Sequence, residues 1–252
     1  MKIAATIQAR TGSSRLPGKV LLPILGRPML ALQVERIRQS RLIDEIILST
    51  SLDKRDDPIE RLARESGVSC FRGSETDVLG RVVGALKSFR VDIHVEFLGD
   101  SPLPDPLLVD SFIGFYLKHS DQYDYVTNGL KTTYPPGAEV SLYPSRVLFD
   151  AEQHANDAAL REHVGCHITR HPERYRICNL EAPPWFHEPE LYLEVDTQED
   201  FEVISAIYEH FYPKNPGFGL AEIIQFMKDH PELSERNRHV ERRWKAFRRD
   251  QK

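Results

Sequence analysis

Short apolar runs alternate with amphipathic stretches through the first half of the chain. Ile3–Ile7, Glu45–Ser51 and Asp92–Leu98 are mainly apolar and of strand length, a pattern typical of strands buried on both faces. Apolar side chains recur at helical spacing in Pro28–Ser40 and Val78–Phe89. Strands that alternate with helices at such short intervals predict an α/β fold, in which helices cover both faces of a mostly parallel sheet.

The same reasoning extends this alternation along the chain. Asp57-Pro58 has the form of an N-cap followed by proline at the first helical position, and it predicts a helix start. We predict a third strand at Val68–Phe71, a helix at Pro106–Lys118 and a strand at Tyr123–Thr127. Since ligands of such folds bind beyond the carboxyl ends of the strands, the polar residues that follow each strand are candidates for one shared site.

The regular alternation ends near Lys131. The second half predicts strands at Ala138–Tyr143, Tyr175–Leu180 and Leu191–Val195, and helices at Ser145–Ala155, at Asp157–Arg170 and around Phe201–Tyr208. We interpret residues 1–233 as a single domain, in which residues 131–190 form an insertion or lid over the first half. Residues 234–252 form a basic C-terminal helix or tail.

A polar, cationic loop follows the first predicted strand. It places Arg10, Arg15 and Lys19 around Gly12 and Gly18. Glycine lets backbone N–H groups turn toward a ligand, arginine forks grip phosphate oxygens, and lysine adds a point charge. The pattern therefore favours a phosphate cradle over a basic surface turn.

The spacing of this loop excludes the Walker A motif. That motif has four residues between its glycines and a Ser or Thr after the lysine. Here five residues separate Gly12 from Gly18, and Val20 follows Lys19. A P-loop ATPase or kinase is therefore disfavoured.

Two aspartates follow predicted strands and are candidate metal ligands. Asp100 ends the Asp92–Leu98 strand region, and Asp196 ends Leu191–Val195. A magnesium–nucleotide complex takes one or two carboxylates together with phosphate and water oxygens. Asp196 also fits a helix start with acidic residues in its first turn, and both interpretations stay open.

Other catalytic patterns are weak in this sequence. His163, His167 and His171 recur every four residues, but the H-E-x-x-H arrangement is absent, so a zinc site is disfavoured. His163 is the better candidate for a substrate contact. No G-x-S-x-G motif appears, and no cysteine lies in a recognisable nucleophile context, so a covalent hydrolase is disfavoured.

Composition narrows the class of protein. The 252 residues are 40% hydrophobic and 28% charged, with a formal net charge of -5, which argues against broad nucleic-acid binding. No apolar run reaches the length of a membrane span, and three cysteines without a C-x-x-C pair fit a cytoplasmic location. The basic tail 236–252 has Val240, Trp244 and Phe247 on one stripe. It fits a solvated face or frayed end better than a surface that docks on the body, a partner subunit or nucleic acid.

Six motifs together resemble a known family. In chain order they are Ile7–Lys19, Phe71–Arg81, Gly99–Leu103, Asp124–Asn128, Arg161–Val164 and Val195–Asp200. As a set they resemble the cytidylyltransferases that make CMP-activated acidic sugars, such as the CMP-KDO and CMP-sialic acid synthetases. The nearest resemblance is to relatives named after the spore coat polysaccharide biosynthesis protein SpsF.

The resemblance implies a Rossmann-like nucleotidyltransferase fold of the glycosyltransferase-A kind. A sugar oxygen would attack the α-phosphorus of CTP, and pyrophosphate would leave. Lys19, Arg10 and Asp100 would be catalytic, and Asp100 and Asp196 would hold Mg²⁺. The nucleotide would contact Ala9, Arg10, Gly12, Ser13, Ser14, Arg15, Lys19, Gly73, Ser74, Asp77 and Arg81. The acceptor sugar would contact Asn128, Glu139, Arg161 and His163 within or beside the 131–190 region.

Two departures from the family pattern concern the acceptor. Val82 and Val83 stand where similar sequences have aromatic residues, and Gly137–Ser141 replaces a Gly-x-Asp-Val-Glu segment. We therefore expect intact nucleotide handling and a diverged acceptor site. The resemblance also implies a homodimer.

Three functions fit these observations. The first is a magnesium-dependent cytidylyltransferase for an acidic sugar of a polysaccharide or glycan. The second is a glycosyltransferase-like enzyme that binds a finished nucleotide sugar, and the third is a non-catalytic nucleotide-binding module of the same fold. Release of pyrophosphate, rather than of a nucleoside diphosphate, separates the first from the second. Unchanged cellular function of Asp100→Asn would favour the third.

Overall fold

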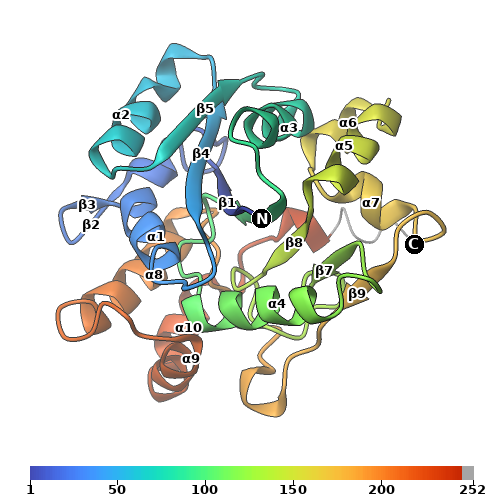
Figure 1. The fold of residues 1–252 in the computed structure, drawn as a ribbon. Coiled ribbons are helices and arrows are strands. Elements are labelled where there is room, and N and C mark those ends of the chain that lie inside the picture. Colours follow the sequence, from blue (N-terminus) through green and yellow to red (C-terminus); the bar gives the residue numbers. More distant parts are fainter. Residues whose placement is uncertain (246–252) are drawn as a thin grey trace.

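A seven-stranded mixed sheet forms the centre of the molecule (Figure 1). The computed structural model describes residues 1–245, apart from the side chain of Ala159. The strand order is β5-β4-β1-β6-β8-β7-β9, in which β8 runs antiparallel to both of its neighbours and the other pairs are parallel. The strands are β1 (Ile3–Gln8), β4 (Glu45–Ser51), β5 (Ser69–Gly73), β6 (Ile93–Leu98), β7 (Tyr125–Thr127), β8 (Ser141–Pro144) and β9 (Ile177–Asn179). The predicted α/β fold with a mostly parallel sheet is confirmed.

Helices cover both faces of this sheet. They are α1 (Met29–Ile37), α2 (Asp57–Glu65), α3 (Val78–Ser88), α4 (Pro106–Lys118), α5 (Ser145–His154), α6 (Ala158–Glu162), α7 (Cys166–Arg170), α8 (Gln198–Phe211), α9 (Leu220–Asp229) and α10 (Pro231–Arg238). Short elements are the hairpin β2 (Pro23–Ile24) and β3 (Arg27–Pro28), and the 3₁₀ turns η1 (Lys19–Leu21), η2 (Lys54–Asp56) and η3 (Pro184–Phe186).

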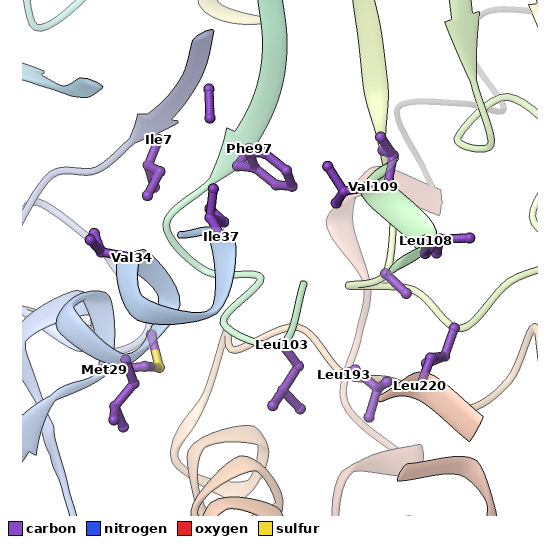
Figure 2. Close-up of a cluster of buried hydrophobic side chains, with 14 of the residues drawn as sticks. Ile7, Met29, Val34, Ile37, Phe97, Leu103, Leu108, Val109, Leu193 and Leu220 are labelled. Atoms are coloured by element: carbon purple, nitrogen blue, oxygen red, sulfur yellow. The ribbon is translucent and has the colours of Figure 1, made fainter. Parts of the chain in front are cut away.

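Strand β1 supplies both hydrophobic cores because successive side chains point to opposite faces of a sheet. Ala5 and Ile7 belong to the core beneath α1, α4 and α8, whereas Ala4 belongs to the core beneath α3 and α5. Figure 2 shows the first core, where Ile7 and Phe97 of the sheet face Val34 of α1. A strand buried on both faces explains why β1 is apolar at nearly every position.

Two predicted elements differ in the structure. Asp157–Arg170 is not one helix, because the chain leaves the helical path between α6 and α7. His163 lies in that break, so it does not share a helix face with His167 and His171. Those two rings do approach, at 4.4 Å between centroids.

The predicted strand Leu191–Val195 is an extended, buried segment outside the sheet. Its backbone bonds to loops rather than to a strand: Leu193 N donates to Pro136 O at 2.7 Å, and Val195 N donates to Asp100 O at 2.8 Å. An apolar run indicates that a segment is buried but not which backbone groups it bonds to. The prediction of a strand at Leu191–Val195 was wrong for this reason. The second bond brings the end of this segment beside the end of β6.

Residues 237–245, called the C-terminal segment below, dock on the body of the protein, contrary to the solvated face that their charge suggested. Arg242 is 4% exposed, and its Nη2 lies 2.7 Å from Oδ1 of Asp200. Trp244 donates from Nε1 to Glu194 Oε1 at 2.7 Å. Phe247, the third member of the predicted stripe, lies outside the described residues.

Asp200 connects this segment to the start of α8. Its Oδ2 accepts hydrogen bonds from the backbone N of Asp196 and Thr197, at 2.9 and 3.0 Å, and closes a capping box. Its Oδ1 accepts from Asn237 Nδ2 at 2.9 Å and from Arg242. A fully buried carboxylate is stabilised only by such a set of donors.

Replacing Asp200 by alanine tests this connection. The variant removes the nearest carboxylate partner of the buried Arg242 charge and leaves the more distant Glu194 at 3.6 Å, so we expect the free energy of unfolding to fall by about 3–5 kcal/mol. Urea denaturation measures the change. Glu202→Ala on the exposed side of the same helix is the matched control, and we expect it to stay within about 0.5 kcal/mol of the parent protein. Equal effects for the two variants would contradict the assignment.

Candidate active site

The loop after β1 and the loop after β6 meet at a cavity of about 450 Å³. The close approach depends on Gly99, since a Cβ there would lie 3.1 Å from both Ala9 Cβ and Gln8 O. Most of the predicted site residues line this cavity: Ala9, Arg10, Gly12, Ser13, Ser14, Arg15, Lys19, Arg81, Asp100, His163 and Asp196. The expectation that strand ends share one pocket is thus met for these residues.

Six predicted site residues are outside the cavity lining. They are Gly73, Ser74, Asp77, Asn128, Glu139 and Arg161. Seven other residues line it that were not predicted as site residues: Gln8, Val20, Val78, Leu98, Gly99, Glu162 and Arg243. All of them except Arg243 lie within two residues of a predicted site residue in the sequence, and that proximity could have indicated them. Arg243 could not be placed, because its position depends on the docked C-terminal segment.

Arg161 and Asp77 form a structural ion pair between helices. Arg161 Nε and Nη2 donate to the two Asp77 oxygens at 2.9 and 2.7 Å, a bidentate arrangement. Asp77 also caps α3 by accepting from Gly80 N at 2.9 Å. The pair therefore holds α6 against the start of α3. It also helps to position His163, which follows α6 in the chain and lines the cavity.

Asn128 and Glu139 shape the loop that joins β7 to β8. Asn128 is 2% exposed, and its amide bonds to Ala138 O at 3.1 Å and to Val140 N at 2.8 Å. Glu139 Oε2 accepts from the backbone N of Gly137 at 2.7 Å. Gly137 has φ +99°, and a Cβ there would lie 2.5 Å from the Leu193 backbone, so only glycine fits.

Lys19 lies at the centre of the site between the two aspartates. Its Nζ is 2.9 Å from Asp100 Oδ2, 3.1 Å from Asp196 Oδ1 and 2.6 Å from the carbonyl oxygen of Val195. Burial by itself lowers the pKa of the Lys19 ammonium, but the two carboxylates outweigh it and hold the pKa above its ordinary value. Lys19 is therefore fully charged at neutral pH.

The other cations surround this centre. Arg15 Nη2 pairs with Asp196 Oδ2 at 2.6 Å, and Arg10 Nη2 lies 3.6 Å from Glu162 Oε1. Arg81 is 4% exposed and donates from Nη1 to Ser74 O at 2.7 Å. Five cationic and three carboxylate side chains line the cavity, so it carries an excess of positive charge that suits a polyanion.

The phosphate loop itself is anchored to the end of β4. Thr11 donates from its backbone N and its Oγ1 to Asp56 Oδ1, at 2.8 and 2.7 Å. Ser51 donates to the other Asp56 oxygen at 2.5 Å. Gly18 has φ +69° and donates to Thr11 O at 2.9 Å, which closes the loop. A loop fixed at both ends can present its cations in a set geometry.

The two aspartates fit a divalent cation. Both carboxylates already reach a single positive centre, the Lys19 ammonium, from two different loops. Two carboxylates leave coordination positions for phosphate and water oxygens, which is the usual environment of Mg²⁺. Among residues 1–245, no three His, Cys, Asp or Glu side chains are grouped as ligands of one metal ion.

Burial shifts the pKa of two groups near the site. Burial lowers the pKa of His163, so its imidazole is neutral at neutral pH. Burial and the neighbouring Glu139 charge raise the pKa of Glu194 to about 8, against the opposing influence of Trp244 and Arg242. Glu194 is thus largely protonated in the folded protein below that pH.

The raised pKa of Glu194 predicts a pH-dependent stability. Between about pH 4.5 and 8 the folded state holds a proton that the unfolded state releases, so this group makes the free energy of unfolding fall as pH rises. Glu194→Gln should remove that decline, and its stability relative to the parent should increase from pH 5 to pH 8. Denaturation across this range measures it. Glu188→Gln is the control, and parallel curves for parent and Glu194→Gln would contradict the prediction.

The fold and this site define a nucleotidyltransferase. A family model described as "Cytidylyltransferase" matches residues 4–239, so the chain belongs to the cytidylyltransferase family. As the resemblance implied, it is a CTP-dependent enzyme of the CMP-sugar synthetase type.

One curated relative and two solved structures illustrate what the chain is similar to. The chain is 34% identical over 233 residues to the spore coat polysaccharide biosynthesis protein SpsF of Bacillus subtilis, covering 90% of this chain and 95% of that protein. A cytidylyltransferase structure from Leptospira borgpetersenii has a TM-score of 0.89 and 27% identity, covering 96% of this chain and 100% of that chain. The structure of CMP:2-keto-3-deoxy-manno-octonic acid synthetase complexed with CTP has a TM-score of 0.64 and 19% identity, covering 83% and 99% of the two chains.

Within residues 1–245, no helix is both long enough and apolar enough to cross a lipid bilayer.

Proposed function

We propose that this protein transfers CMP from CTP to an acidic ulosonic or nonulosonic sugar, with Mg²⁺, for the synthesis of a surface polysaccharide or another glycan. The observation that carries the proposal is the Lys19 ammonium held between Asp100 and Asp196 at the edge of a cation-lined cavity. The name of SpsF supports a role in polysaccharide synthesis, and the resemblance of the motifs to synthetases of CMP-activated acidic sugars supports the class of acceptor.

The reaction needs positioning and charge neutralisation more than covalent help. A sugar hydroxyl oxygen bonds to the α-phosphorus, the bond from that phosphorus to the bridging oxygen breaks, and pyrophosphate takes the electron pair while the hydroxyl proton passes to water. Arg10, Arg15 and Lys19 bind the phosphates in this scheme. Ser13 and Ser14 add hydrogen bonds from the anchored loop.

Asp100 and Asp196 hold the magnesium ion in this proposal. When bound, the ion supplies positive charge to the phosphate oxygens. Lys19 and Arg15 contact these carboxylates in the structure, and the phosphates of the nucleotide would offer both cations alternative anionic partners.

The nucleoside end lies toward α3 in this proposal, where Arg81 lines the cavity. Asp77 supports that wall through its pair with Arg161, and Gly73 and Ser74 lie just before it in the chain. Arg81 donates to Ser74 O, which links this segment to the cavity.

We propose His163 as a direct acceptor contact because it lines the cavity. Asn128, Glu139 and Arg161 act on the acceptor through the position of the β7–β8 loop and of α6, since their polar atoms already bond to the protein. The segment Gly137–Ser141 thus affects the shape of the acceptor site rather than its direct contacts.

Pyrophosphate release tests the reaction. The protein is incubated with Mg²⁺, with CTP, UTP, ATP or GTP, and with a panel of ulosonic and nonulosonic acids. We expect release with CTP and one class of acid. Release of a nucleoside diphosphate from a finished nucleotide sugar would instead indicate a glycosyltransferase, and the absence of any nucleotide effect on the melting temperature would overturn the phosphate cradle.

Asp100→Asn separates catalysis from folding. The amide keeps the size of the side chain but removes the charge that faces Lys19 and the metal, so we expect turnover to fall at least about a hundredfold. Asp229→Asn, at the exposed end of α9, is the matched control and should keep full turnover. Unchanged turnover of Asp100→Asn would remove this residue from the mechanism.

We also propose that the protein works as a homodimer. Light scattering at micromolar concentration should give a mass near twice the 29.0 kDa of the chain. A mass of one chain would show that the monomer is the solution state.

A further inference from the structure

The C-terminal segment reaches the rim of the nucleotide cavity. Arg243 lines the cavity and donates from Nη1 to Ser14 Oγ at 3.2 Å. Two residues earlier, the carbonyl oxygen of Glu241 accepts from Arg15 Nη1 at 2.8 Å. Both contacts join the segment to the phosphate loop. They lie beyond residue 239, where the match to the family model ends.

Buried groups hold the segment in this position. Arg242 Nη2 bonds to Asp200 Oδ1 at 2.7 Å, and the guanidinium lies 4.3 Å from the centre of the Tyr192 ring. Trp244 is tied to Glu194 on the other side of Arg243. Because its two neighbours are fixed to the body, the exposed Arg243 side chain is directed along the cavity rim by the chain itself.

Charge pairing distinguishes Arg243 from three other cations of the cavity. Lys19, Arg15 and Arg10 each face a carboxylate. Within residues 1–245, Arg243 forms no ion pair, and its hydrogen bond goes to the neutral hydroxyl of Ser14. Its charge is therefore available to an incoming anion without breaking an existing pair, and an arginine fork suits phosphate oxygens.

We propose that Arg243 is a further nucleotide-binding residue, which contacts the β- and γ-phosphates that leave as pyrophosphate. This inference rests on the proposed function. Lys19, Asp100 and Asp196 form a cluster at one end of the phosphate site. Arg243 contacts the phosphate loop at a different point, through the hydroxyl of Ser14. A triphosphate that lies along the loop from Lys19 to Ser14 brings its distal phosphates beside Arg243. The C-terminal segment is then part of the active site.

Calorimetric titration with pyrophosphate, CTP and CMP tests this assignment. For Arg243→Gln we expect about tenfold weaker binding of pyrophosphate and CTP, because a charge-assisted contact is lost, and unchanged binding of CMP. Arg243→Lys keeps the charge without the fork and should bind with intermediate affinity. Arg236→Gln is the matched control, since that arginine is an exposed residue of α10 paired with Glu202. Equal melting temperatures show that the variants fold alike.

Several outcomes would overturn the inference. They are a pyrophosphate affinity of Arg243→Gln equal to that of the control, an equal loss for CMP and pyrophosphate, and a parent protein that does not bind pyrophosphate. The binding assay needs no turnover. Pyrophosphate binding that depends on Arg243, in a protein that releases none from CTP, would therefore refute the proposed reaction alone. Turnover by the parent protein with unaltered pyrophosphate binding by Arg243→Gln would refute only the present inference.

Discussion

A buried ammonium group between two carboxylates organises this molecule. Lys19 comes from the turn after β1, Asp100 from the end of β6, and Asp196 from the extended segment that follows residue 190. A charge with this little contact with water is stable only when partners surround it, so the three segments must meet at one point. The same requirement places the phosphate loop, the strand ends and the two candidate metal ligands within reach of one ligand.

Asp200 adds a second connection one helical turn beyond Asp196. One of its oxygens caps α8 and fixes the backbone of Asp196, while the other binds Asn237 and Arg242. The geometry of the candidate metal ligand and the position of the C-terminal segment therefore depend on the same carboxylate. Because Asp200 is fully buried, both of its oxygens accept hydrogen bonds from protein donors and not from water. A substitution at this residue would therefore disturb the fold and the candidate metal ligand together.

Several polar residues that the sequence suggested as ligand contacts bond to the protein itself. Arg161 holds α6 to α3, and Asn128 with Glu139 fixes the loop between β7 and β8. These polar side chains looked like ligand contacts because polar residues near a site can serve either purpose. Their hydrogen bonds to the protein itself show a structural contribution, and those bonds are visible only in the structure.

The sequence by itself determined the sheet, most of the helices and the composition of the phosphate loop. Apolar periodicity and glycine placement are local properties, and the strands end where the polar loops begin, so β1 and α4 were predicted within a residue or two. Only the tertiary structure decided which distant groups meet. The burial of Arg242 against Asp200 and the position of Arg243 beside Ser14 arise from contacts between segments far apart in the chain. A run of basic residues looks the same whether it is solvated or docked. Whether such a run is docked depends on a carboxylate partner such as Asp200, and the fold places that partner beside it.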